Sequence, residues 1–531
     1  MKRYIRPQVG IFAFAVLFSL TAAGAAILVQ FTKGNLLDQA LAGLSNDTIR
    51  FILILLALII FEIFCYYLFD RMRGLYFVRA KAALREDFFK AQLRKTPIMM
   101  MEEKQGGILA AYTDQINLAA NSYLLNLPLL FDVILKIILV TIALFWLDVR
   151  VALLTIFLLT TPLYVPKLIE ARLQKAQIAN TEAFQEHLGK LTEWLGGFEL
   201  IKNYGAERPV LKLFLRSNRR VEDKDYAMRK MGYLSRSLSA VLSYLSHFII
   251  LAYSAWLVIE GSFTAGSFFI AVGMIDQLSY PIISISLYLQ EIIAARPVIN
   301  ELLEEIDAPS DEDIKELIPE KPYDIAFHQV SFAHSTDKII LTDFNLDVAA
   351  GEKCLITGPS GGGKTTLMNL LLGYYPPDKG IITIGKASTD EIKDLNSYIT
   401  IMRQDPVLFN DTLRNNLCLY QDVPEEAMIE MLKKLNLDHF ANKEGLDSLV
   451  LEGGSNFSGG ERKRICLART LLRKSPIIIL DEPLANVDPE TANQIADLTG
   501  NFEDTTLFVI SHVHSQNWTN AFEHKVSVAG H

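Results

Sequence analysis

Long apolar stretches recur between charged positions in the first part of the chain. A membrane helix needs about 20 predominantly apolar residues, and six stretches approach or exceed that length. They predict helices at residues 8–32, 51–69, 124–147, 151–170, 237–259 and 262–290. The apolar run of the fourth is the shortest and contains Pro162 and Pro166, which disfavour a regular helix. The pattern predicts an α-helical transmembrane domain of six helices over residues 1–306.

The first apolar stretch could also be a secretory signal peptide. It is longer than the usual core of such a peptide, and no clear small-x-small cleavage site precedes Lys33. We therefore expect a retained membrane helix.

Two long polar stretches, residues 70–123 and 171–236, join the apolar ones. Both keep helical spacing, so we expect membrane helices that continue beyond the bilayer, with turns near residues 97–107 and 196–207. Basic residues outnumber acidic ones by nine to six over residues 70–114 and by fourteen to nine over residues 167–236. Positive charge accumulates on the cytoplasmic side. We therefore expect a multi-pass protein of the plasma membrane whose N-terminus, long loops and C-terminal half are cytoplasmic.

Four ionisable residues fall inside the apolar stretches, where charges are costly and often functional. Asp132 and Lys136 are four residues apart, which predicts an ion pair on one helix face. Glu62 and Asp276 have no evident partner in the sequence. For each of the four, helix packing and a position in a cargo cavity remain open.

The composition changes after residue 307. Residues 1–307 have 31 Lys and Arg against 27 Asp and Glu, whereas residues 308–531 have 20 against 33. The acidic balance excludes a basic nucleic-acid binder, and four cysteines in 531 residues exclude a disulfide scaffold. Proline and acidic residues predict a linker over residues 307–322. Apolar runs that alternate with helical stretches then predict an α/β domain with a mostly parallel sheet over residues 323–531.

The clearest motif in this domain follows an apolar strand at residues 353–357 and precedes a helical run. It matches G-x-x-x-x-G-K-[ST] and consists of Gly358, Pro359, Ser360, Gly361, Gly362, Gly363, Lys364 and Thr365, followed by Thr366. In such a P-loop, backbone N–H groups surround phosphate oxygens, the lysine contacts the β- and γ-phosphates, and the hydroxyl after it ligates Mg²⁺. A P-loop protein that binds a nucleotide and Mg²⁺ is expected, and this motif alone would also fit a soluble kinase or GTPase.

A second apolar strand ends in the adjacent carboxylates Asp481 and Glu482. A carboxylate at this position can hold Mg²⁺, and its neighbour can act as general base for the attacking water. We assign these roles to Asp481 and Glu482 respectively.

These motifs resemble those of the ATP-binding cassette (ABC) transporters. The resemblance includes a signature sequence at Phe457–Glu461, a helical subdomain at about residues 405–465 and, less specifically, the exporter-type membrane half. It implies that Gln404 senses Mg²⁺ and that His512 contacts the γ-phosphate. It implies further nucleotide-binding positions at His334 (adenine stacking), Asp488 (D-loop), Ser458, Gly459, Gly460 and Glu461. Phe457 and Glu461 depart from the usual Leu and Gln of the signature.

The resemblance also implies a dimer, because each ATP in this family lies between the P-loop of one cassette and the signature of the other. The chain has one of each, so a homodimer and a heterodimer with a related half-transporter are both open. The function implied is ATP-driven export of a lipid, peptide or amphipathic small molecule by alternating access. The alternatives are an exporter-fold importer of siderophore-bound metal or haem and an ATPase-coupled membrane regulator that moves no cargo.

Overall fold

The computed structural model describes residues 1–43, 46–102, 105–308, 317–335, 338–359, 361–405, 407–484, 489–500, 504–511 and 521–528. Contacts within the chain define two compact units. The first is Met1–Gln92 with Gly106–Ala308, and the second is Leu93–Gln105 with Pro309–His531.

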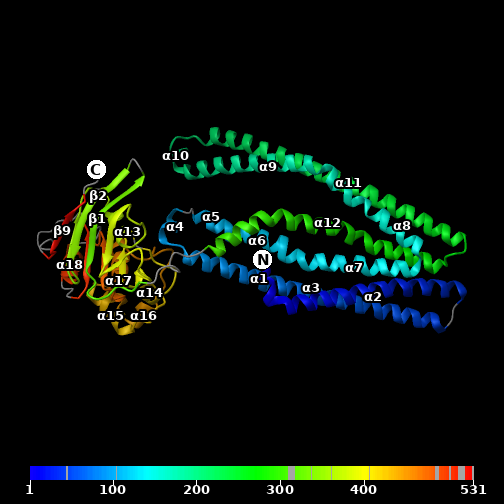
Figure 1. Ribbon diagram of the computed structural model, residues 1–531, viewed down its shortest axis with the longest axis horizontal. Helices are drawn as coiled ribbons and strands as arrows, with labels where there is room; N and C mark the ends of the chain where they lie inside the picture. The colour runs from blue at the N-terminus through cyan, green and yellow to red at the C-terminus, as the bar shows by residue number, and fades with distance from the viewer. Residues whose placement is uncertain are drawn as a thin grey trace. The chain divides into compact units, whose positions relative to one another are not determined.

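The first unit is helical in its described residues (Figure 1). Its longer helices are α2 (Val9–Ala42), α3 (Asn46–Arg94), α7 (Asn126–Leu147), α8 (Val149–Leu159), α9 (Val165–Gly196), α11 (Glu207–Ile259) and α12 (Ala265–Asp307). Short helical segments lead into α2 and α7: α1 (Lys2–Ile5), η1 (Arg6–Gln8), α5 (Gln105–Ala110), η2 (Ala111–Gln115), α6 (Ile116–Ala119) and η3 (Ala120–Leu125).

Five helical stretches of the described residues are long and apolar enough to cross a membrane. They are Lys2–Ala42, Thr48–Arg94, Gly107–Leu147, Glu207–Ile259 and Ala265–Asp307. The predicted fourth helix over residues 151–170 is interrupted in the structure. It consists of α8, then the 3-10 turn η4 (Thr161–Tyr164), then α9, and the apolar part is short. Pro162 lies in that turn and Pro166 in the first turn of α9, where proline is tolerated.

The polar stretches after the second and fourth apolar runs are helical. α3 continues to Arg94, and α9 and α11 pack side by side up to the segment that joins them (Figure 1). Instead of simple turns, the predicted turn regions contain the six-residue helices α4 (Pro97–Glu102) and α10 (Phe198–Asn203).

Helices α2 and α12 approach closely at a pair of glycines. A Cβ added at Gly34 would lie 2.6 Å from the Gly266 carbonyl oxygen and against the Ile270 side chain. Beside this contact, the Gly266 amide donates to Asp38 Oδ1 over 2.7 Å, and the Thr264 hydroxyl donates to Asp38 Oδ2 over 2.7 Å. The contact fixes the register of the two helices.

We expect Gly34→Ala to lower the thermal stability of the membrane unit. Alanine is the better helix former by about 1 kcal/mol, but overpacking costs typically about 1–3 kcal/mol, and here the obstacle is backbone. Gly24→Ala on the same helix is the matched control, because a Cβ there meets nothing within 4 Å. Unfolding of both variants is followed by calorimetry in detergent. A Gly34→Ala melting temperature equal to that of Gly24→Ala would contradict the packing.

The ion pair predicted between Asp132 and Lys136 is confirmed, with Nζ 2.9 Å from Oδ2. Two further helices join it. Ser19 of α2 donates to Asp132 Oδ1 over 2.7 Å, and Lys136 donates to the Tyr66 hydroxyl of α3 over 3.1 Å. The pair therefore ties α7 to α2 and α3, and Asp132 is almost fully buried.

The second unit contains two β-sheets. An antiparallel sheet has the strand order β2-β1-β4-β5, with β1 (Ile325–Ser335), β2 (Lys338–Val348), β4 (Lys379–Ile384) and β5 (Ala387–Ser388). A parallel sheet has the order β6-β7-β8-β3-β9, with β3 (Lys353–Thr357), β6 (Ile399–Met402), β7 (Ile477–Asp481), β8 (Thr506–Ile510) and β9 (His524–Ser527). β7 and β8 are fully buried, as expected for inner parallel strands.

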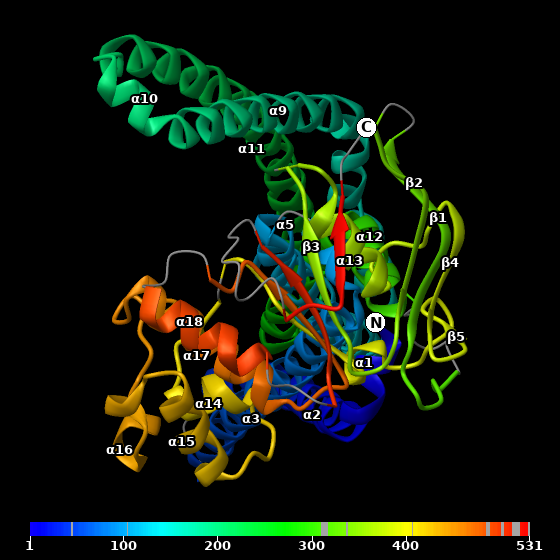
Figure 2. The ribbon, with the colours of Figure 1, turned by 90° about the vertical axis from the view of Figure 1, so that its left-hand side faces the viewer.

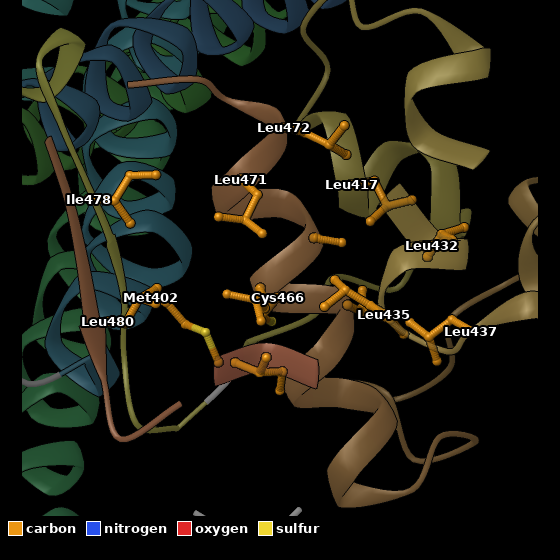
Figure 3. Close-up of a cluster of buried hydrophobic side chains, with 14 of the residues drawn as sticks. Met402, Leu417, Leu432, Leu435, Leu437, Cys466, Leu471, Leu472, Ile478 and Leu480 are labelled. Carbon is orange, nitrogen blue, oxygen red and sulfur yellow. The ribbon is translucent and has the colours of Figure 1, made fainter. Parts of the chain in front are cut away.

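Helices accompany both sheets (Figure 2). They are α13 (Lys364–Leu371), η6 (Leu395–Ser397), α14 (Leu413–Cys418), α15 (Glu425–Lys434), η7 (Asp438–Phe440), α16 (Lys443–Leu446), α17 (Gly459–Leu472) and α18 (Pro489–Gly500). One apolar cluster joins the parallel sheet to the helical subdomain through α17 (Figure 3). It includes Met402, Leu480, Cys466, Leu471 and Leu432. This core holds the ends of β6, β7 and α17 in place.

Candidate functional site

The predicted catalytic residues follow strands of the parallel sheet. The P-loop follows β3, Asp481 ends β7 and is followed by Glu482, and Gln404 lies two residues after β6. β8 lies between β7 and β3 in the sheet. Because parallel strands have their carboxyl ends at one edge, the fold brings these segments to the same edge.

Three glycines of the P-loop, Gly358, Gly361 (φ of 78°) and Gly363, have backbone conformations that favour glycine. Gly358 has a φ of 146°, and Gly363, directly before α13, has a φ of 96°. A Cβ at Gly358 would collide with the Val528 carbonyl, and one at Gly363 would lie 2.5 Å from Ile340 Cγ2. The loop therefore passes close to neighbouring segments and ends at the N-terminus of α13, where amide groups can bind an anion.

The Lys364 side chain is folded onto its own loop. Its Nζ donates to the Gly358 carbonyl over 3.0 Å and to the Pro359 carbonyl over 2.8 Å, and the residue is buried. Thr365, next in the helix, is exposed, and Thr366 is buried. The loop carbonyls thus hold the ammonium of Lys364 inside the loop that is expected to take phosphates.

At the end of β7, Asp481 and Glu482 have different surroundings. Burial raises the pKa of Asp481; Arg403 opposes this and the Glu482 carboxylate adds to it. Glu482 has a positive φ of 51°, and its amide donates to the Ile510 carbonyl of β8 over 2.9 Å. Gln404 Nε2 donates to Glu482 Oε2 over 2.9 Å. The structure therefore joins Gln404 to Glu482 across the ends of β6 and β7.

We expect Asp481→Asn to raise the thermal stability of the nucleotide-free protein. The folded protein holds the Asp481 proton more tightly than the unfolded chain, so stability decreases as the pH rises through the pKa of the unfolded and then of the folded state. At neutral pH the ionised carboxylate is destabilising. If its removal is worth about 1 kcal/mol, the melting temperature rises by about 2–4 °C.

Calorimetry of the Asp481→Asn protein measures this shift, and Asp390→Asn, at an exposed position, is the control. The gain should shrink as the pH is lowered and the native carboxyl becomes protonated. A lower melting temperature for Asp481→Asn at neutral pH would show that the charge is not destabilising.

The signature segment caps α17. The Ser458 hydroxyl accepts from the Glu461 amide over 3.2 Å, while the Ser458 amide and hydroxyl both donate to Glu461 Oε2 over 2.8 Å. This reciprocal arrangement is a capping box. His439 Nε2 lies 3.2 Å from Glu461 Oε1. Burial alone would raise the pKa of Glu461, but the contacts with Ser458 and His439 outweigh it and lower that pKa.

The glutamate at position 461 of the signature therefore occupies the Ser458 amide and hydroxyl with its own negatively charged carboxylate. We expect Glu461→Gln to lower the KM for ATP by about three- to tenfold, because it removes a negative charge from a helix N-terminus expected to face phosphate. Steady-state ATPase assays measure the change, with the exposed substitution Glu430→Gln as control. An unchanged or higher KM would indicate that the Glu461 carboxylate does not oppose ATP.

Several predicted positions lie outside the described residues. Ser360, Asp488 and His512 are among them, and so is the side chain of His334, although its backbone belongs to β1. Their expected roles stay predictions.

Three residues that the sequence did not single out contact this site. Arg403 donates to Asn369 Oδ1 over 2.8 Å and opposes the rise in the Asp481 pKa. The buried Lys463 donates to the Glu482 carbonyl over 3.4 Å, and His439 contacts Glu461. Arg403 precedes Gln404 and Lys463 follows the signature, so their positions beside these motifs could have suggested both residues. His439 lies next to no motif in the sequence.

Comparison with known proteins shows the family of the chain. The family model described as "ABC transporter transmembrane region" matches residues 12–282, and the one described as "ABC transporter" matches residues 341–485. The chain belongs to the ABC transporter family. It combines a helical transmembrane region with an ATP-hydrolysing, ATP-binding domain and lies in a membrane.

Relatives of this ABC transporter include bacterial proteins. A putative multidrug export ATP-binding/permease protein of Bacillus subtilis is 29% identical over 82% of this chain and 76% of its own. An ATP-dependent lipid A-core flippase of Syntrophus aciditrophicus is 27% identical over 96% and 87%. The solved structure of a bacterial Atm1-family ABC exporter with ATP bound superposes with a TM-score of 0.79 at 21% identity, over 99% of this chain and 93% of that one. The structural similarity shows that the fold is shared.

Proposed function

We propose that this ABC transporter is one half of an ATP-driven exporter of an amphipathic molecule such as a lipid, peptide or drug. The observation that carries the proposal is the meeting of Lys364, Asp481 and Glu482 at one sheet edge in a chain that also has membrane-spanning helices. The relatives named for export and for lipid flipping support outward transport over import.

The proposed site fits Mg²⁺ together with ATP. The cation prefers oxygen ligands, and Thr365, Gln404 and Asp481 offer a hydroxyl, an amide carbonyl and a carboxylate. The raised pKa of the buried Asp481 indicates a carboxylate that a cation would stabilise. When bound there, Mg²⁺ would neutralise charge on the phosphate oxygens.

Each residue of the proposed site has a separate role in ATP hydrolysis. Glu482 accepts the proton of the attacking water, and Gln404 holds its carboxylate through the 2.9 Å hydrogen bond. When ATP binds, the Lys364 ammonium leaves the Gly358 and Pro359 carbonyls and donates to phosphate oxygens instead. Backbone amides at the N-terminus of α13 donate to the other phosphate oxygens. By family resemblance, His512 contacts the γ-phosphate.

The proposed active unit is a dimer. Each chain provides one P-loop and one signature, and in this family the signature acts on the nucleotide of the other cassette. A second copy of this chain would complete both sites, and a related half-transporter is the other partner to test. The orientation that fits this unit has the N-terminus and the cassette in the cytoplasm, as the basic loops predict.

Reconstitution in liposomes tests the proposal. The cassettes face outward in part of the population, and ATP added outside energises only those molecules. We expect ATP to drive fluorescent phospholipid analogues or amphipathic dyes from the cassette-side leaflet to the opposite side, with ATPase stimulated by the cargo. ATPase without movement of any probe would favour a regulator, and movement toward the cassette side would favour an importer.

A further inference from the structure

Helices α2 and α12 border a hollow of about 350 Å³ that carries both signs of charge. Residues that line it include Gln30 and Lys33 of α2 and Phe269, Val272, Asp276 and Gln277 of α12. Both helices belong to the apolar spans. Charged groups at such a position are expected to face water, a partner or a ligand.

Asp276 borders this hollow at about the middle of the apolar span. It follows the start of α12 by eleven residues, or about 16 Å along the helix axis, against about 30 Å for a hydrocarbon core. Its side chain is 68% exposed in the single chain. An ionised carboxylate so exposed to lipid would be very costly, so this face of α12 is expected to meet water, a ligand or the second half of the dimer instead of lipid.

One oxygen of Asp276 is held by a neighbouring helix. His247 of α11 lies with Nε2 2.8 Å from Asp276 Oδ1, and its Nδ1 lies 3.4 Å from the Ser279 hydroxyl. Gln277 donates to the Ala26 carbonyl over 3.1 Å. These contacts fix the carboxylate and the α2–α12 register at this level.

Lys33 provides the opposite charge. No hydrogen bond or ion pair engages its ammonium among the residues that the structure describes, and it does not pair with Asp276. The Glu62 carboxylate of α3 is near enough to attract the ammonium electrostatically without bonding to it. Gly34 faces Gly266, and Ala26 is bonded to Gln277, so the antiparallel register places Lys33 about two turns, or about 10 Å, from the level of Asp276.

We propose that this hollow binds the head group of a zwitterionic lipid, with the anionic group at Lys33 and the ammonium at Asp276. The Lys33 side chain is long and flexible, so a single zwitterionic head group can reach both Lys33 and Asp276. Phe269 and Val272 border the apolar part of the ligand. The proposal rests on the proposed export function and specifies the class of its cargo.

Equilibrium binding without nucleotide tests the hollow separately from transport. The protein in detergent micelles is titrated with fluorescent lysophosphatidylethanolamine. Unlabelled competitors whose hydrocarbon chains have the same length are compared: zwitterionic lysophosphatidylethanolamine, anionic lysophosphatidylglycerol and a cationic alkylammonium. We expect the zwitterion to bind about tenfold more tightly than either single charge, as one additional charge-assisted contact would give.

Two variants test the assignment of the charges. Lys33→Gln should remove the preference for the zwitterion over the cation, and Asp276→Asn should remove its preference over the anion. Lys190→Gln, outside the apolar spans, should change neither. Equal binding of all three head groups, or unchanged selectivity in Lys33→Gln, would overturn the proposal even if Asp276→Asn failed to fold. If the hollow binds the zwitterionic lipid selectively but ATP drives no movement of it, the proposed export function is wrong and the binding site stands.

Discussion

Glu482→Gln should stop ATP turnover while ATP binding persists. The substitution keeps the shape of the side chain but removes the group that accepts the proton of water. General base catalysis contributes typically about 10²–10⁴-fold, so we expect the ATPase rate to fall by that factor. The hydrogen-bonding position next to Gln404 is retained, and ATP should remain trapped in the dimer.

The phosphate release rate and the amount of retained radiolabelled ATP measure the two effects. Glu430→Gln is the control, because Glu430 is an exposed carboxylate paired with Lys434 on α15. A Glu482→Gln protein that hydrolysed ATP at the parental rate would refute the assignment of the base. If it bound no ATP, the role of Glu482 would be in nucleotide binding.

Lys364→Ala should abolish ATP binding. Lys364 carries the point charge of the P-loop, and hydrogen bonds to charged groups are worth about 1.5–3 kcal/mol each. The loss of two contacts with phosphate corresponds to at least about 100-fold in affinity. The carbonyls of Gly358 and Pro359, which now accept from Nζ, would also lose their donor.

Binding of a fluorescent ATP analogue measures the loss, with Lys434→Ala as the exposed lysine control. Calorimetry of the Lys364→Ala protein distinguishes lost binding from lost folding. Retention of parental ATP affinity in a folded Lys364→Ala protein would exclude the loop as the phosphate site.

Local sequence patterns were sufficient to predict most of the architecture. Apolar runs indicated the membrane helices because a bilayer imposes a minimum length, and the P-loop lay between a strand and a helix as the motif requires. The interruption at η4 was indicated only by Pro162 and Pro166. The pair Asp132–Lys136 was predictable since its members are one helical turn apart.

Contacts between distant segments were not predictable in the same way. His247 and Asp276 lie on different helices, and nothing local couples them. The same holds for His439 beside Glu461 and for the bond between Gln404 and Glu482. The order of strands in the parallel sheet brings Gln404 to Glu482, and a single sequence does not reveal that order.

Mixed dimers test whether each ATP site is shared between the P-loop of one chain and the signature of the other. Two differently tagged chains, both with Glu482→Gln, are co-expressed: one also carries Lys364→Ala and the other Gly460→Asp. Purified dimers with both tags are assayed for trapped ATP. We expect one trapped ATP per mixed dimer and none in either homodimer, because one site of the mixed dimer combines an intact P-loop with the intact signature of the other chain. Mixed dimers that trap no ATP, or Gly460→Asp homodimers that trap it fully, would show that the sites are not shared between the two chains.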